Sequence, residues 1–280
     1  MSKKAAIVRK TLFYGFLVLI TVVVLFPAFC MVLNSFIDNA ELLQSYGSGG
    51  FAKLHFIPAK ATVQAYVEIL LVTPDYLMKF WNSLFMVSII VAGQTMVASL
   101  GGYGFAKFHF PLKNTLLSII IVLMLMRYQV TLVPSYIVLD SFGLIGSYLS
   151  IILPGVFSVF GVFLLSQAFS SIPTNILEAA QIDGANAFQV FYKIAVPNGK
   201  MGITAVVILT FIDNWNMVEQ PLVFLKDPSM YPLSVFLSRI NLSSMHIAFA
   251  CGVLAMLPVT LLLLYMKEAL VQGIEYASLK

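Results

Sequence analysis

Long apolar stretches separated by shorter polar segments run through the 280-residue chain. One membrane crossing by an α-helix needs about 20 predominantly apolar residues. Six stretches approach that length: Leu12–Leu33, Trp81–Phe105, Leu112–Val133, Tyr148–Phe169, Ile203–Val223 and His246–Met266. The pattern predicts an all-α integral membrane protein with six transmembrane helices, which form a single domain over residues 1–280.

The segment between the first two stretches, about residues 34–80, is too long for a simple turn. Gly47–Gly50 can form a bend, and a helical pattern follows between Pro58 and Pro74. Apolar residues recur there at the spacing of one helix face: Val63, Tyr66, Val67, Leu70 and Leu71. We expect a helix that lies on the outer leaflet of the membrane.

Composition and charge agree with a membrane location. Hydrophobic residues make up 60% of the chain and charged residues 10%, whereas soluble domains carry roughly 25% charged residues. The net charge of +4 comes from scattered basic residues, which excludes a nucleic-acid-binding stripe.

Orientation follows from where the 16 Lys and Arg residues fall. Ten lie on the predicted inner side: Lys3, Lys4, Arg9, Lys10, Lys107, Lys113, Lys193, Lys200, Lys267 and Lys280. An excess of basic residues marks cytoplasmic segments. We therefore expect a multi-pass protein of the cell membrane, with an uncleaved N-terminal anchor and both termini in the cytoplasm.

Candidate catalytic chemistry is sparse. Cys30 and Cys251 both lie in apolar stretches, which favours packing over a disulfide or a metal site. His55, His109 and His246 lie in different segments and form no metal-ligand or nucleophile–base pattern. The chain contains no Gly-rich phosphate-binding motif, so we expect it to bind no ATP itself. We predict no catalytic residue, no metal and no cofactor, and a protein that is not an enzyme.

The polar segment between the fourth and fifth stretches, about residues 170–202, contrasts with its apolar surroundings. Pro173 suits the first turn of a helix that Ser170 or Ser171 would cap, and that helix would run to about Ile182. The segment therefore begins with a short helix that faces water.

A second short helix is expected after a sharp turn. Gly184 can adopt the positive φ that ends a helix. The second helix would run from about Ala187 to Ile194, with Phe188, Phe191 and Tyr192 on its apolar side, and Pro197 would end it. Such a compact pair of helices is a surface that another protein can grip.

The first of these helices carries the residues best suited to a partner. Ala179 and Ala180 keep it thin, so that a groove can approach its backbone closely. Glu178 and Asp183 can accept charge-assisted hydrogen bonds from that partner.

The spacing resembles the EAA loop of ABC importer permeases: Glu-Ala-Ala, three residues, Gly, nine residues, Ile, one residue, Leu-Pro. The matching positions are Glu178, Ala179, Ala180, Gly184, Ile194 and Pro197, and Val196 stands where leucine is usual. The resemblance implies a loop that docks into a cleft of an ATP-binding subunit and transmits its closure to the membrane helices. The alternative is an ordinary loop between two spans.

Further segments are similar to the sugar-importer branch of these permeases, the MalG-like proteins: residues 81–84, 102–108, 132–136, 163–167 and 182–185. This resemblance implies the type I ABC importer permease fold and sugar or oligosaccharide import by alternating access. It also implies four partners besides the lipid bilayer: two ATP-binding subunits, a second, MalF-like permease and an extracellular solute-binding protein. The alternatives are an importer for a polyamine or glycerol phosphate, and a channel or scaffold outside the ABC class.

The fifth stretch contains a polar cluster. Asp213 lies about eleven residues into the stretch, where an ionisable side chain costs about 2.5–3.5 kcal/mol by insertion measurements. Asn216 and Gln220 follow at i+3 and i+7 on the same helical face, with Trp215 and Glu219 nearby. We interpret these five residues as part of a sugar path. Hydrogen bonding between helices, or a broken helix end near the surface, would explain them equally well.

The outer segment after the fifth stretch, residues 226–245, contains Pro228, Pro232 and polar turn residues. The sequence alone predicts an exposed loop. The resemblance implies that this loop probes the ligand cleft of the external binding protein.

Overall fold

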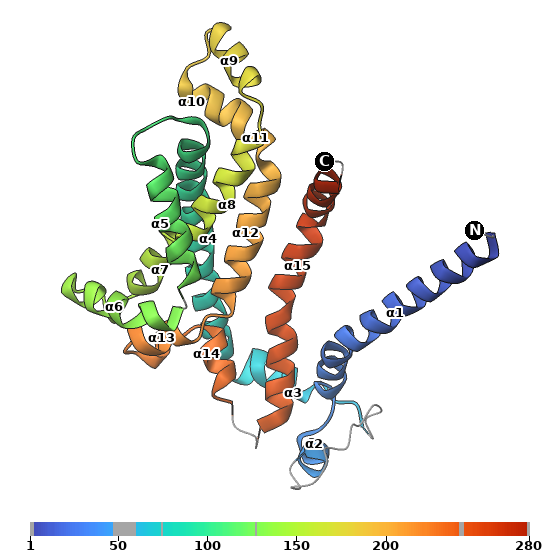
Figure 1. Ribbon diagram of the computed structural model, residues 1–280. Helices are drawn as coiled ribbons and strands as arrows, with labels where there is room; N and C mark the ends of the chain where they lie inside the picture. The colour runs from blue at the N-terminus through green and yellow to red at the C-terminus, as the bar shows by residue number, and fades with distance from the viewer. Residues whose placement is uncertain (1–2, 47–59, 74, 127, 241–243, 279–280) are drawn as a thin grey trace. The chain divides into compact units, whose positions relative to one another are not determined.

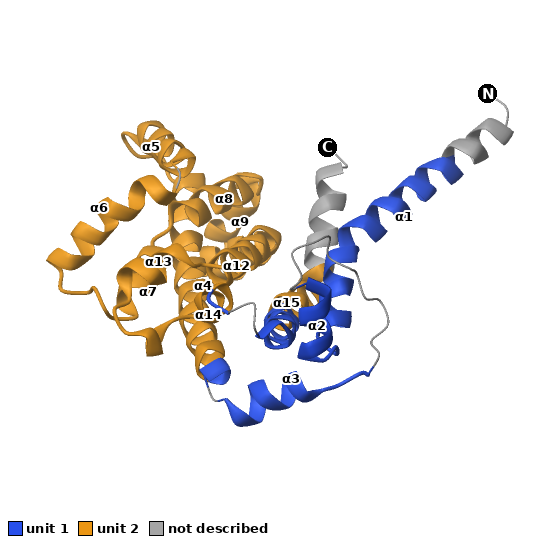
Figure 2. Ribbon diagram, turned by 90° about the horizontal axis from the view of Figure 1, so that it is seen from below, with its two compact units in different colours: residues 1–77, 239–256 blue, residues 78–238, 257–280 orange. Residues whose placement is uncertain are grey.

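The computed structural model describes residues 3–46, 60–73, 75–126, 128–240 and 244–278. Two compact units emerge from the contacts within the chain (Figure 2). Unit 1 comprises Met1–Leu77 and Arg239–Met256, and unit 2 comprises Met78–Ser238 and Leu257–Lys280. Helices account for nearly all of the regular structure described, and one isolated antiparallel bridge joins Ile37 and Ala61.

The elements follow one another in a simple order (Figure 1). They are α1 (Lys3–Asn34), α2 (Asn39–Tyr46), α3 (Gln64–Val67), the π-helical turn η1 (Glu68–Val72), α4 (Asp75–Lys107), α5 (Lys113–Leu125), α6 (Tyr128–Ser141), α7 (Leu149–Val156), α8 (Val159–Ser170), α9 (Thr174–Ile182), α10 (Ala187–Val190), the π-helical turn η2 (Phe191–Ala195), α11 (Val196–Asn198), α12 (Lys200–Trp215), α13 (Glu219–Phe224), the 3-10 turn η3 (Pro228–Met230), α14 (Leu233–Ser238) and α15 (Met245–Ser278).

Four helical segments in the described chain are long and apolar enough to cross a membrane: Lys10–Asn34, Asp75–Lys107, Leu149–Ser170 and Met245–Lys267. The total is six if each of two bent helix pairs counts as one span. A straight third crossing over Leu112–Val133 is wrong, because α5 ends at Leu125 and α6 leaves at an angle of 107°. Met126 adopts an extended conformation at this break, with ψ of 128°.

Unit 1 contains the helix expected between the first two spans. The helix covers Gln64–Val72 as α3 and η1, and the Tyr66 hydroxyl lies 2.7 Å from the Ser35 Oγ. Four of the five residues of the predicted apolar face are exposed: Val63, Val67, Leu70 and Leu71. Ala65 and Ile69 on the other side are buried. The helix thus keeps an apolar face uncovered, and its place on the outer leaflet stays a prediction. Gly47–Gly50, Pro58 and Pro74 lie outside the described residues.

Unit 2 is built around three helices, α4, α8 and α12, that pack closely because glycines lie at their contacts. A Cβ added at Gly102 of α4 would lie 2.7 Å from the Leu165 Cβ of α8. A Cβ at Gly202 of α12 would overlap Ala168 of α8. Leu165 and Val206 are fully buried between these helices. Because lipid is as apolar as these side chains, close van der Waals packing through small residues is what holds such helices together.

The segment after α13 folds back onto the start of α4. The Asn82 amide donates to the Ser229 carbonyl (2.8 Å), and the Leu233 main-chain N–H donates to the Ser83 hydroxyl (2.7 Å). Leu233 and Val235 are buried, so the prediction of an exposed loop is wrong for α14. Residues 226–229 are exposed, as predicted.

Candidate functional site

The polar segment 170–202 forms two short helices at one end of unit 2, and we call it the knob (Figure 1). The first helix, α9, begins after Pro173, which occupies the cap position itself. The predicted hydroxyl cap is wrong. The Ser170 hydroxyl donates to the Ser166 carbonyl and the Ser171 hydroxyl to the Ala168 carbonyl, each at 2.7 Å. These serines therefore satisfy carbonyls at the end of α8 and leave the start of α9 uncapped by a side chain.

The turn after α9 confirms the prediction for Gly184, which has φ of +87°. The Ala185 N–H donates to the Ala180 carbonyl and the Gly184 N–H to the Gln181 carbonyl, both at 3.0 Å. These two bonds define a Schellman motif, which needs a residue in the left-handed region. A Cβ at Gly184 would meet nothing within 4 Å, so the requirement for glycine comes from the backbone angle alone.

The second helix of the knob is longer than predicted. It begins with a capping box that the sequence analysis missed: the Gln189 N–H donates to Asn186 Oδ1 (2.8 Å) and the Asn186 N–H to Gln189 Oε1 (3.0 Å). The Asn-x-x-Gln spacing is the signal that could have revealed it.

Pro197 does not end this helix. The π-helical turn η2 precedes it, and Pro197 lies in the first turn of α11, where a missing N–H costs little. The helix continues to Asn198 and then bends by 74° into α12.

Aromatic packing anchors the knob to the membrane helices. Phe169 of α8 and Tyr103 of α4 have ring centroids 5.8 Å apart, and Phe191 of η2 lies 5.1 Å from Tyr103. Phe169 is fully buried. The Lys107 ammonium at the end of α4 donates to the Ile172 carbonyl (2.5 Å), where the chain leaves α8. These contacts therefore tie the knob to α4 and α8.

The predicted coupling residues lie mainly on the surface of the knob. Glu178, Ala179, Asp183, Gly184 and Pro197 are exposed, and Ala180 and Ile194 are half-buried. Large apolar side chains are exposed beside them: Ile182 is 87% exposed, and the stacked rings of Phe188 and Tyr192 are 69% and 63% exposed. Apolar side chains clustered with charged ones on a projection are typical of a protein-binding surface.

The fifth span is broken, which corrects the prediction of one helix over Ile203–Val223. α12 ends at Trp215 and α13 begins at Glu219. Asp213 therefore lies near the end of α12. Asn216 and Gln220 do not follow it on one helical face.

Two features explain the break. Pro221 cannot donate a hydrogen bond to the Met217 carbonyl, which an unbroken helix would require. The Asn216 amide instead donates to the Ile212 carbonyl (2.8 Å), a side-chain bond that satisfies the helix end. Pro221 was thus a readable signal that the sequence analysis did not use.

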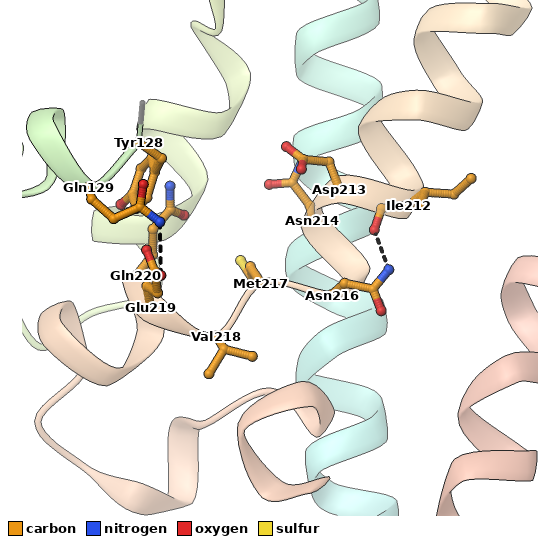
Figure 3. A pocket seen from close by; sticks show the side chains of 10 residues that line it. All are labelled: Tyr128, Gln129, Ile212, Asp213, Asn214, Asn216, Met217, Val218, Glu219 and Gln220. Carbon is orange, nitrogen blue, oxygen red and sulfur yellow. Dashed lines mark hydrogen bonds between the residues drawn. The ribbon is translucent and has the colours of Figure 1, made fainter. Parts of the chain in front are cut away.

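A cavity of about 490 Å³ opens at this break (Figure 3). It brings together four of the five predicted path residues: Asp213, Asn216, Glu219 and Gln220. Trp215 points elsewhere. It is 4% exposed, and its ring packs against Phe80 and Phe211.

The broken third span supplies the opposite wall. Tyr128 and Gln129 begin α6 and line the cavity, as does Asn214 of α12. The Gln129 amide donates to Glu219 Oε1 (3.1 Å), which links α6 to α13. These three residues were not among the predicted site residues. We call the seven polar residues of this cavity the polar pocket: Tyr128, Gln129, Asp213, Asn214, Asn216, Glu219 and Gln220.

Apolar membrane-length helices, a polar pocket between two broken helices and a projecting knob define a solute permease subunit. The sequence comparison specifies the class. Residues 94–276 match the family described as "Binding-protein-dependent transport system inner membrane component", and the chain belongs to that family. The resemblance stated from the EAA spacing is confirmed, and the protein is a permease subunit of an ABC importer.

Relatives of known name cover almost the whole chain. It is 26% identical over 268 residues to the arabinooligosaccharides transport system permease protein AraQ of Bacillus subtilis (strain 168), with 95% of this chain and 94% of the relative covered. It is 27% identical to the lactose transport system permease protein LacG of Rhizobium radiobacter, with 93% of each covered. It is 28% identical to the sn-glycerol-3-phosphate transport system permease protein UgpE of Yersinia pestis, with 92% and 93% covered.

Solved structures confirm the predicted fold class. A chain of a bacterial ABC transporter that imports the acidic polysaccharide alginate superposes with a TM-score of 0.80 at 19% identity, and 96% of this chain and 98% of that chain are covered. A bacterial alginate ABC transporter in complex with an alginate pentasaccharide-bound periplasmic protein gives a TM-score of 0.64 at 16% identity, with 93% and 94% covered.

Proposed function

We propose that this chain, acting as one permease domain, moves a sugar or an oligosaccharide into the cell by alternating access, driven by ATP hydrolysis on partner subunits. The observation that carries the proposal is the knob, an ordered and exposed projection joined directly to α8 and α12. The relatives named for arabinooligosaccharides and lactose support a saccharide as the substrate.

The knob is the site at which we infer coupling. Glu178, Ala179, Ala180, Asp183 and Gly184 form its tip and would enter a cleft of an ATP-binding subunit. Ile194 and Pro197 belong to its stem, which leads into α12. A complete importer would contain two such ATP-binding subunits and a second, MalF-like permease. A solute-binding protein would deliver the substrate from outside.

The path from the knob to the pocket is a single helix. α12 has 16 residues, which corresponds to about 24 Å at 1.5 Å per residue. A rotation of the knob by a closing ATP-binding subunit would therefore move Asp213 at the far end of α12. We assign the knob and both termini to the cytoplasmic side, and the pocket to the substrate path, which comprises Asp213, Asn216, Glu219 and Gln220. Trp215 would support this wall from behind.

The turn at Gly184 provides a test with a matched control. Gly184→Val forces a β-branched side chain into φ of +87°, whereas Gly143→Val imposes similar strain at φ of +68° in the turn after α6. We expect Gly184→Val to abolish saccharide uptake while the protein still inserts into the membrane. Gly143→Val should retain at least half of the uptake.

The measurement is ATP-driven uptake by vesicles that contain the assembled importer, together with its ATPase rate. Normal uptake by Gly184→Val would contradict the coupling role of the knob. Equal loss in both variants would mean that backbone strain alone had been measured.

A further inference from the structure

We propose that the polar pocket binds the hydroxyl groups of an uncharged saccharide and discriminates against phosphorylated or carboxylated solutes. This inference rests on the proposed import function and goes beyond it, because it assigns Tyr128, Gln129 and Asn214 to substrate recognition. It depends on which hydrogen-bonding groups of the pocket are already used within the protein.

The two asparagines expose oxygen atoms. The Asn214 amide nitrogen donates to the Thr210 carbonyl and the Asn216 amide nitrogen to the Ile212 carbonyl, each at 2.8 Å. Both nitrogens are thus committed to the end of α12. The side-chain oxygens of both residues accept no hydrogen bond from a described residue and are left for a ligand.

The two carboxylates add further acceptors. Glu219 Oε1 accepts the hydrogen bond from Gln129, so Glu219 Oε2 keeps its capacity. Asp213 is exposed to the cavity and accepts no hydrogen bond from any residue described (Figure 3). Because ionised carboxylates only accept hydrogen bonds, this wall selects ligands that donate them.

Tyr128 adds a hydrogen-bond donor to the pocket, so a ligand group that fits must both donate and accept hydrogen bonds. Its hydroxyl oxygen is buried beside the Gln220 side chain, which interacts with it without a hydrogen bond of normal geometry. A ligand hydroxyl that displaces Gln220 would accept a better hydrogen bond from this phenol. A sugar hydroxyl donates to a carboxylate and accepts from a phenol at once, whereas an ammonium group only donates and a phosphate dianion only accepts.

Charge and size agree with this assignment. Among the described residues that line the pocket, two are acidic and none is Lys or Arg. Arg127, next in sequence to Tyr128, lies outside the described residues, and the test below includes it. The cavity of about 490 Å³ falls in the usual range for small-molecule sites, roughly 300–1,000 Å³. Breaks in membrane helices are also where transporters commonly place their substrate sites.

The test uses the assembled importer in lipid nanodiscs, with a reporter cysteine that has no polar role. Val218 lines the pocket, and Val218→Cys in a Cys30→Ala background would react with a water-soluble maleimide. The probes are lactose, sn-glycerol 3-phosphate and spermidine at equal concentration and ionic strength. We expect lactose to slow the labelling at least threefold and the two charged probes to leave it unchanged.

Variants separate recognition from general access. Glu219→Gln and Asp213→Asn keep the side-chain shape and remove the charge, and each should weaken protection by lactose about tenfold in concentration. Asp140→Asn removes an exposed carboxylate of α6 outside the pocket and should leave protection unchanged. Protection by lactose that survives both pocket variants would overturn the proposal.

Other outcomes also decide. Protection by spermidine alone, or by none of the probes, would overturn it. Protection by sn-glycerol 3-phosphate that disappears with Arg127→Gln would assign the pocket to an anion. Saccharide uptake measured in parallel keeps the two proposals distinct. Uptake that is unaffected by the pocket variants contradicts only the proposed substrate binding in the polar pocket. Lactose protection without ATP-driven uptake contradicts only the proposed import function.

Discussion

The two ends of α12 differ in how they contact the rest of unit 2. At the end next to the knob, Gly199 and Gly202 let the backbone approach Phe169 and Ala168 so closely that no Cβ would fit. At the opposite end the helix breaks after Trp215, and its polar side chains line a cavity. One end is fixed by packing and the other borders a cavity. The transmission of motion proposed here, from the knob to the pocket, needs this difference.

The packed end should dominate stability. Phe169→Ala removes a fully buried ring that touches both Tyr103 and Phe191. Such truncations cost about 3–5 kcal/mol. We expect this loss in the unfolding free energy of the purified protein in detergent. Phe142→Ala, at a residue that is 73% exposed, should change it by less than about 0.5 kcal/mol.

If the two phenylalanine variants unfolded at the same denaturant concentration, the aromatic anchor of the knob would have no energetic basis. An intermediate loss for Phe169→Ala accompanied by normal uptake would mean that the anchor stabilises the protein without transmitting force.

A smaller but more specific effect is expected from filling the close approach of α12 to α8. Gly202→Val would overlap Ala168, and overpacking of this kind costs about 1–3 kcal/mol. Gly104→Val is the matched control, because a Cβ at Gly104 in α4 meets nothing within 4 Å. Thermal unfolding of the two variants should differ by several degrees. Equal melting temperatures would show that the helices are not in close contact at Gly202.

Mutations at the break between α12 and α13 should change saccharide uptake more than the free energy of unfolding. Pro221→Ala restores the N–H that an unbroken helix needs, so α12 and α13 can join. We expect the free energy of unfolding to change by less than about 1 kcal/mol. Saccharide uptake should fall because the pocket loses its shape. Pro134→Ala, in α6, is a control that removes a proline outside the pocket. Full uptake by Pro221→Ala would show that the break serves no function.

The smallest effect concerns pH at the outer segment. The Ser229 N–H donates to Asp227 Oδ1 (2.8 Å), and this bond lowers the pKa of the Asp227 carboxyl. A lowered pKa in the folded state adds stability above the unfolded pKa of about 3.9, and the contribution is lost as the pH falls through the folded value. The protection of the Ser229 and Met230 amides against hydrogen exchange, relative to the intrinsic exchange rate at each pH, should therefore fall below about pH 4. Asp227→Asn keeps a side-chain oxygen that can accept the Ser229 N–H, so the turn is preserved, but the change in hydrogen exchange with pH should disappear. An unchanged pH dependence would refute its assignment to the Asp227 carboxyl.

The membrane helices could be predicted from the sequence because apolar runs of this length rarely occur outside membrane-spanning segments. The length of a run, however, does not show where it bends. In the third stretch, only the polar run Arg127, Tyr128 and Gln129 marks the place where α6 begins. Pro221 marked the second break more clearly, since proline forbids a continuous helix there.

The knob was predictable in its spacing and less so in its details. Gly184 follows from a backbone requirement that only glycine meets cheaply, and the structure confirms it. The serine cap failed because Ser170 and Ser171 found nearer carbonyls in α8. Which helix a hydroxyl serves depends on the turn between them, and the sequence does not specify that geometry.

The polar pocket was half predictable. Asp213, Asn216, Glu219 and Gln220 stood out because polar residues are rare in an apolar stretch. Trp215 was predicted to line the path because the residues beside it in the sequence are polar. Its large ring instead packs against Phe80 and Phe211, which buries more apolar surface than a place in the cavity wall would. Tyr128 and Gln129 are also polar residues in an apolar stretch, but their place opposite α12 and α13 depends on tertiary contact.

The coupling role of the knob is tested most directly by crosslinking. Asp183→Cys at the exposed tip would be treated, in the assembled importer, with a reagent that carries a maleimide and an amine-reactive ester, and Phe142→Cys at another exposed position is the control. We predict a crosslink from residue 183 to an ATP-binding subunit, with a yield that changes when ATP is added, and no such product from residue 142. A residue 183 that crosslinks to no ATP-binding subunit, or that reacts with an impermeant maleimide applied outside intact cells, would contradict the account.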